Sequence, residues 1–214
     1  MKKKLPTLSL AIIIAACFKL LIPLCAQAQD PFNSLPAKHS ATRLITILPK
    51  SLLLTVNSAE VCFTPGGPCT DLIVATLAKA KQQVLVQAYQ LTAEPIAQAL
   101  INAKARGIDV DVILDKSQLH QRSAMTCELL ANGIPVLIDK KPAIAHNKVM
   151  IIDEHEVITG SFNFSDNAQF HNAENLLIIH DKALAQEYMR NWNQRASQSV
   201  SLDPEQEEKL ACRR

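Results

Sequence analysis

Short apolar runs alternate with amphipathic stretches from residue 60 to residue 138, and this alternation constrains the fold more than any other feature. The apolar runs contain many β-branched residues and have the length of strands. The stretches between them repeat apolar residues at helical spacing. Three more apolar runs follow between residues 146 and 179 without long helices between them. We therefore predict an α/β fold in which a mixed β-sheet is flanked by helices.

The expected elements follow from these periodicities and from the residues that stop them. Gly107 and Gly133 should end two helices, because glycine readily adopts the conformation that closes a helix. The expected strands cover residues 60–63, 84–89, 108–114, 134–138, 146–152, 156–162 and 174–179. The expected helices cover residues 70–81, 94–106, 123–132 and 182–196. A domain over residues 58–196 would then be followed by a polar, mobile tail over 197–214.

Residues 1–28 have the pattern of a secretory signal peptide. Three lysines precede a long apolar stretch, and an Ala-Gln-Ala sequence ends at Ala28. We expect cleavage after Ala28, a periplasmic or secreted protein, and an N-terminal extension over residues 29–57. Two alternatives stay open: the stretch is retained as a membrane anchor in spite of Lys19, or Cys17 carries a lipid.

The overall charge does not suggest a nucleic-acid-binding protein. The sequence has 22 basic and 20 acidic residues, a formal charge of +2, but four of the lysines lie in the first 28 residues. Without them 18 basic residues face 20 acidic ones, so any phosphate must be recognised by a local cluster. Lys140 and Lys141 form the best such pair, although a solvated loop without a role explains them equally well.

Four cysteines remain after the signal peptide, and four cysteines permit three pairings. Cys62 and Cys69 flank the segment Phe-Thr-Pro-Gly-Gly-Pro, whose turn-forming residues can bring the two sulfurs together. We predict this disulfide. Cys127 is expected to be a small buried apolar residue, and the pairing of Cys127 and Cys212 stays open.

The chemistry is concentrated in the segment from His146 to Asn163. Residues two apart on a strand share a face, so His146 and Lys148 should point the same way, as should Ser161 and Asn163. If the two strands pair as a hairpin, an imidazole, an ammonium, a hydroxyl and an amide converge. Such a set suits a phosphodiester, which needs a nucleophile and donors for its anionic oxygens. No cluster of carboxylates accompanies it, so we expect neither a catalytic metal nor another cofactor.

With Asp153 and Gly160 in place, the pattern His-x-Lys-x4-Asp-x6-Gly-Ser-x-Asn resembles the signature of the phospholipase D superfamily. The likeness covers residues 58–196 and is closest to the short, secreted, metal-independent bacterial endonucleases with one motif per chain. It implies that one histidine attacks phosphorus while a second protonates the leaving oxygen. Because this chain has one motif, the resemblance implies a homodimer with a shared site.

The resemblance also implies roles for individual residues. His146 would be the nucleophile in one chain and the acid in the other, while Lys148 and Asn163 hold the phosphate and Ser161 supports them. Glu174 matches the acidic residue that binds the histidine and fixes its tautomer. Asp153 completes the motif, but we expect it to organise a turn rather than to transfer a proton.

Three functions fit these residues. The first is a non-specific endonuclease acting on DNA or RNA, because the site can contact phosphate and nothing identifies a residue that reads bases. The second is a phospholipase D-type hydrolase acting on phospholipid, which an exposed apolar rim around the site would favour. The third is a catalytically idle binding module on an envelope or conjugation apparatus. Among the other histidines, His120 could touch substrate, and His171 is expected in a loop.

Overall fold

The computed structural model describes residues 58–121 and 123–202. The predicted signal peptide, the extension over residues 29–57 and Cys212 lie outside this part of the chain. No helix in the described ranges is both long enough and apolar enough to cross a bilayer.

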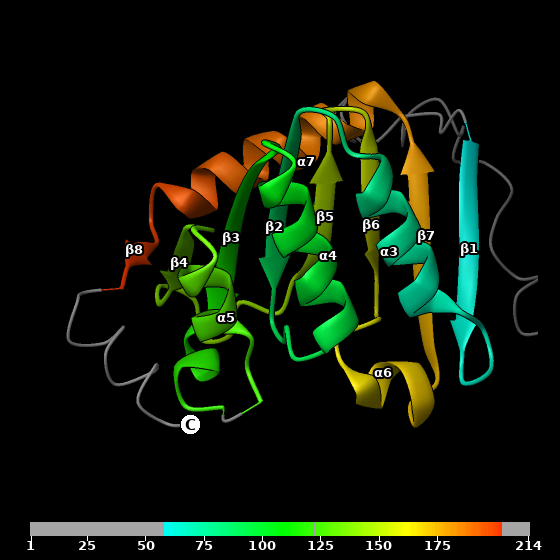
Figure 1. Ribbon diagram of the computed structural model, residues 1–214, viewed down its shortest axis with the longest axis horizontal. Helices are drawn as coiled ribbons and strands as arrows, with labels where there is room; N and C mark the ends of the chain where they lie inside the picture. Colours follow the sequence, from blue (N-terminus) through cyan, green and yellow to red (C-terminus); the bar gives the residue numbers. More distant parts are fainter. Residues whose placement is uncertain (1–57, 122, 203–214) are drawn as a thin grey trace, which may run out of the picture. The chain divides into compact units, whose positions relative to one another are not determined.

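A single mixed sheet of eight strands organises the described residues, in the order β1-β7-β6-β5-β2-β3-β4-β8 (Figure 1). The neighbours β2, β3 and β4 are parallel, and the other neighbouring pairs are antiparallel. The fold class predicted from the alternation is therefore confirmed. The strands are β1 (Ser58–Thr64), β2 (Gln83–Ala88), β3 (Asp109–Asp115), β4 (Val136–Asp139), β5 (Lys148–Ile152), β6 (Glu156–Gly160), β7 (Glu174–His180) and β8 (Val200–Ser201).

Helices cover both faces of this sheet. The main core lies on the face of α3 (Cys69–Lys79), α4 (Glu94–Ala105) and α5 (Thr126–Ala131). A smaller apolar cluster lies under α7 (Lys182–Ala196) on the opposite face (Figure 1). Trp192 of α7 is buried there, and its indole N–H donates to the carbonyl of Val86 over 3.1 Å.

Local chemistry explains where the helices begin and end. The first turn of α4 contains a proline, whose missing N–H costs nothing at that position. Gly107, at a φ of 86°, follows the end of the same helix. At the start of α7 the Asp181 carboxylate accepts the N–H of Leu184 over 2.8 Å and caps the helix.

The structure differs from the sequence-based expectation in four places. The short helix α6 (Asp166–Phe170), capped by Ser165, and the 3-10 helix η2 (Lys116–Leu119) were not predicted. The expected tail contributes β8, which pairs with β4, and Leu202, which is buried. The fifth strand begins at Lys148 rather than at residue 146. Because the fifth strand begins at Lys148, His146 lies in the loop before the strand and not on it.

The predicted Cys62–Cys69 disulfide is present and joins β1 to the first turn of α3. The two Cα atoms lie 5.6 Å apart, which is an ordinary span for a disulfide. Gly67 closes the loop between them, and a Cβ there would clash with the Phe63 carbonyl oxygen. Cys127, expected to be buried, is partly exposed.

Candidate active site

The motif residues other than Asp153 meet at one end of the sheet. This end holds the carboxyl ends of β1, β2, β3, β4 and β6 together with the first residues of β5 and β7. The predicted hairpin is formed, because Met150 of β5 pairs with Ile158 of β6. The sheet therefore brings the segment around His146 close to the segment around Asn163, although the two are far from adjacent in sequence.

Lys148 is the buried charge of the site, with 7% of its surface exposed. Its Nζ donates to the backbone carbonyl of His146 over 2.9 Å. The same ammonium lies 5.1 Å from the ring centroid of Tyr89, a cation–π contact. Burial lowers the pKa of Lys148 below its ordinary value, and the negative charge of Glu174 opposes part of that shift. Glu174 therefore helps to keep Lys148 charged.

His146 lies in the loop before β5 and is exposed to solvent. Its ring packs against Tyr89, with the two centroids 4.6 Å apart and the planes inclined by 47°. The N–H of Tyr89 donates to the carbonyl of Asn147 over 2.8 Å, which fixes the same loop from the backbone. Tyr89 thus contacts both principal motif residues. The sequence analysis gave it no role, because only its place at the end of an apolar strand was visible.

Asp115 is a second positioning residue that the sequence analysis missed. It ends β3 and is buried, and its carboxylate accepts the N–H of Ala145 over 2.7 Å and the N–H of Ser117 over 2.9 Å. Burial alone would raise the pKa of Asp115, but these hydrogen bonds and the nearby charge of Lys116 outweigh it and hold the pKa below its ordinary value. The residue before His146 is therefore tied to the sheet by a charged hydrogen bond.

Ser161 and Asn163 follow β6 and do not share a strand face as expected, because the strand ends at Gly160 and not at residue 162. Gly160 has a φ of 143°, and a Cβ there would clash with the Asn175 carbonyl oxygen, so the close approach of β6 to β7 requires glycine. The Ser161 hydroxyl accepts the N–H of Asn175 over 3.0 Å, while the Asn175 side chain accepts the N–H of Ser161 over 2.8 Å. Ser161 therefore ties the end of β6 to the start of β7.

The side-chain oxygen of Asn163 is buried and has no hydrogen-bond partner in the described structure. A buried polar atom without a partner is costly. This oxygen is an acceptor, so a phosphate oxygen would not satisfy it, and the predicted phosphate contact of Asn163 would be made by the N–H groups of its amide.

Glu174 begins β7, and its carboxylate accepts a hydrogen bond from the Asn172 amide over 2.9 Å. No hydrogen bond joins Glu174 to His146 within residues 58–121 and 123–202. The tautomer-fixing contact that the resemblance implies is therefore not formed here, and the effect of Glu174 that this structure supports is on the charge of Lys148.

Asp153 lies at the opposite end of β5 from Lys148. Its carboxylate accepts the N–H groups of Lys81, Gln82 and Gln83 over 2.9, 2.8 and 3.0 Å. Its own φ is 51°, a left-handed conformation that Asp tolerates better than most residues. These contacts tie the β5–β6 turn to the segment between α3 and β2, which is the geometry of a structural residue.

The two adjacent lysines, Lys140 and Lys141, have different surroundings in the structure. Lys140 lines a groove together with Tyr89, Lys116, His120 and Ile144. Lys141 is exposed but is not among the residues that line it, and its backbone N–H donates to Asp139 over 3.2 Å.

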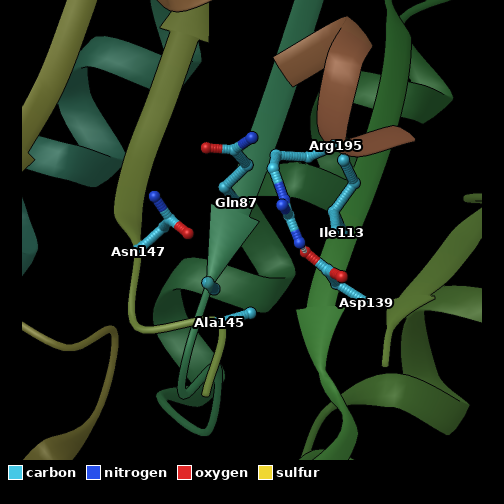
Figure 2. Close-up of a pocket in the computed structure, with 7 residues that line it drawn as sticks. Gln87, Ile113, Asp139, Ala145, Asn147 and Arg195 are labelled. Atoms are coloured by element: carbon cyan, nitrogen blue, oxygen red, sulfur yellow. Dashed lines mark hydrogen bonds and ion pairs between the residues drawn. The ribbon is translucent and has the colours of Figure 1, made fainter. Parts of the chain in front are cut away.

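A narrow cleft on the α7 face of the sheet is lined by Ala145 and Asn147, the two neighbours of His146 in sequence (Figure 2). On one side Arg195 of α7 reaches Asp139 at the end of β4 and forms an ion pair with it. On the other side lie Gln87 and Asn147. The Asp139 side chain is only 2% exposed, so Arg195 compensates a buried charge next to the site.

The other candidate ligands do not form a metal site. His171 is exposed after α6, in a loop as predicted, near the ring of Phe170. In the described residues no group of three or more His, Cys, Asp and Glu side chains is placed to hold a metal ion.

Residues 73–196 match the protein family described as cardiolipin synthase, PLD-like domain. The chain belongs to the phospholipase D superfamily. A "Phospholipase D" from Rickettsia conorii is 48% identical over 145 residues, which cover 67% of this chain and 72% of that relative.

Two solved structures match the fold. Nuc from Salmonella typhimurium, described as a phospholipase D family member, has a TM-score of 0.65 and 33% identity. The match covers 68% of this chain and 97% of Nuc. NucT from Helicobacter pylori has a TM-score of 0.60 and 22% identity, with coverage of 68% and 99%, and supports the fold alone.

Proposed function

We propose that this superfamily member is a metal-independent phosphodiesterase acting on nucleic acid through a histidine nucleophile. One observation carries the proposal: the exposed imidazole of His146 and the buried ammonium of Lys148 both contact the ring of Tyr89, and the ammonium donates to the His146 backbone carbonyl. An exposed imidazole can reach a phosphorus atom, and a buried ammonium can stabilise the charge that develops on the phosphate oxygens.

In the proposed reaction a ring nitrogen of neutral His146 attacks phosphorus, and a nitrogen–phosphorus bond replaces the bond to the leaving oxygen. A second histidine, protonated, gives its proton to that oxygen. The second histidine then takes a proton from water, whose oxygen attacks phosphorus and releases His146. Lys148 and Asn163 bind the phosphate oxygens throughout, and no metal is needed for any step.

The second histidine is proposed to come from another copy of the chain. Two of the other described histidines lie far from the site, since His155 is in the β5–β6 turn and His180 ends β7 between Glu60 and Glu156. A two-fold dimer would bring two copies of His146 together. Exposed Val61 and Phe63 offer apolar surface on β1, on the face opposite the buried Cys62.

Nucleic acid is the proposed substrate because lysines lie beside the site. Lys116 and Lys140 line the groove that shares Tyr89 with His146 and Lys148. Phosphate contacts of this kind bind nucleic acid without reading its sequence. The Cys62–Cys69 disulfide supports a location outside the cytoplasm, where disulfides persist.

Phospholipid is the second candidate, and two observations favour it. The similar proteins from Rickettsia carry the name phospholipase D. Large apolar side chains are also exposed near the site end of the sheet, namely Ile144 at 57%, Phe170 at 64% and Phe63 at 64%. Such side chains are typical of proteins that act at a lipid surface.

The test is incubation of the purified protein, in EDTA, with plasmid DNA, single-stranded RNA and phosphatidylcholine vesicles. We expect cleavage of the nucleic acids by the wild type and none by His146→Ala with an unchanged circular dichroism spectrum. Hydrolysis of the vesicles alone would replace nucleic acid by phospholipid as the substrate. Full activity of His146→Ala, or activity that depends on added Mg²⁺, would overturn the proposed chemistry, and no turnover of any substrate would favour the binding module.

The shared site has its own test. Wild-type chains are mixed with an excess of His146→Ala chains under conditions in which subunits exchange. A dimer with one remaining imidazole cannot complete the reaction, so activity should fall as mixed dimers form. A strictly monomeric protein in the ultracentrifuge, with specific activity unchanged on dilution, would exclude the shared site.

A further inference from the structure

A groove of about 680 Å³ opens beside the active site. It is bounded by the end of β2, by η2 and by the loop that follows β4. Tyr89 forms part of its wall and also contacts His146 and Lys148, so the groove is continuous with the place where the scissile phosphate would lie. Its volume lies in the range of pockets that hold small organic ligands.

The charged groups of the groove favour an anion. Lys116 and Lys140 both line it, and His120 adds an imidazole. Lys116 uses one N–H for the Pro142 carbonyl over 3.1 Å, and an ammonium has three. The acidic residue in the lining, Asp115, is committed to the N–H groups of Ser117 and Ala145. The groove therefore presents donors rather than acceptors.

The remaining lining is apolar and exposed. Leu119, Ala143 and Ile144 contribute it, and Ile144 keeps 57% of its surface accessible. An apolar side chain held in the open beside two ammonium groups fits a ligand with a flat apolar part and an anionic part. A nucleotide has both parts, because its base packs against apolar side chains while its phosphate binds cations.

We propose that this groove holds the nucleotide next to the scissile phosphodiester, with its phosphate at Lys140 and its base against Ile144. The assignment rests on the proposed nuclease function and makes it more specific. A base can pack there only when it is unpaired, so a single strand fits the groove better than a duplex. An acyl chain along Ile144 is the competing occupant, and the experiment distinguishes the two.

The test compares two phosphodiester substrates of the purified protein, with phosphatidylcholine vesicles as a third. Bis(4-nitrophenyl) phosphate has the reacting diester but no flanking nucleotide, and a short single-stranded oligonucleotide has both. Lys140→Ala and Ile144→Ala should each lower kcat/KM for the oligonucleotide, relative to that for the small diester, by about fivefold. Lys140→Ala should also reduce the slope of log(kcat/KM) against log salt by about 0.7, which a purely structural effect would not do.

The matched control is Lys182→Ala, because Lys182 is exposed at the start of α7, away from the site end of the sheet. Variants of Lys140 and Ile144 that behave like this control on the oligonucleotide would overturn the groove assignment alone. A loss confined to phosphatidylcholine vesicles would assign the groove to lipid instead. Wild-type protein that hydrolyses the small diester but not the oligonucleotide would overturn both the groove assignment and the proposed nuclease function.

Discussion

Removal of the Asp153 carboxylate should lower the free energy of unfolding without stopping the reaction. The carboxylate accepts three backbone N–H groups and so joins the β5–β6 turn to the chain before β2. Asp153 follows Lys148 by five positions along the strand, a distance of roughly 17 Å at about 3.3 Å per residue. No proton can pass directly over that distance, so the motif aspartate acts on stability.

The size of the effect follows from the contacts. A single buried hydrogen bond to a charged group contributes roughly 1.5–3 kcal/mol, but the three bonds here are largely exposed and the freed N–H groups can bind water, so together they contribute about 2–4 kcal/mol. Alanine at a φ of 51° adds about 1 kcal/mol of backbone strain. We expect Asp153→Ala to lower the free energy of unfolding by about 3–5 kcal/mol and the Tm by roughly 6–20 °C. Asp153→Asn should lose less than half as much, because asparagine tolerates this φ and keeps one acceptor oxygen.

The assay pairs thermal unfolding, followed by circular dichroism, with turnover at a temperature well below the lower Tm. Both variants should keep kcat within about twofold of the wild type, since no contact of the site is removed. A large loss of turnover in Asp153→Asn with an unchanged Tm would refute this reasoning and make Asp153 a participant in the reaction.

Three further outcomes follow from the site. Tyr89→Leu should lower kcat about 5- to 30-fold, because the ring contact with the catalytic loop and the cation–π contact contribute roughly 1–2 kcal/mol together, whereas Tyr89→Phe should keep most of the activity. Arg195→Ala leaves the Asp139 carboxylate buried and unpaired, so chemical denaturation should show a loss of about 3–5 kcal/mol, against less than about 1 kcal/mol for Arg190→Ala, whose ion pair is exposed. Because the pKa of Asp115 is held below its ordinary value, its stabilising effect is present above about pH 4 and is lost as the pH falls through the folded-state pKa. The difference in unfolding free energy between wild type and Asp115→Asn should therefore shrink on acidification, and a constant difference would contradict the assignment.

The sheet and the longer helices were predictable because each leaves a local mark in the sequence. The alternation around β2, α4 and β3 records which residues face the core, and Gly107 records where a helix ends. The five-residue α6 and the two-residue β8 are too short to show a period, and β8 depends on a partner strand about 60 residues away.

The site was only half predictable for the same reason. The motif identified His146, Lys148 and Asn163 from their spacing. The motif did not show that His146 lies in a loop before the strand. That loop is held by two contacts, in which the N–H of Ala145 donates to Asp115 and the N–H of Tyr89 donates to the carbonyl of Asn147. These contacts join segments about 30 and 60 residues apart in sequence, so no pattern within the motif could reveal them.

The position of β8 has a consequence for how the molecule behaves at high concentration. A strand at the border of a sheet offers unsatisfied N–H and C=O groups to any extended chain, which is a common origin of aggregation. Leu137 and Ile138 of β4 would lie at such a border, but β8 pairs with both and Leu202 packs beside it. A protein ended after residue 196, where the motif resemblance stops, would keep its catalytic residues but expose the edge of β4, so it should aggregate through that edge more readily than a chain that includes β8 and Leu202.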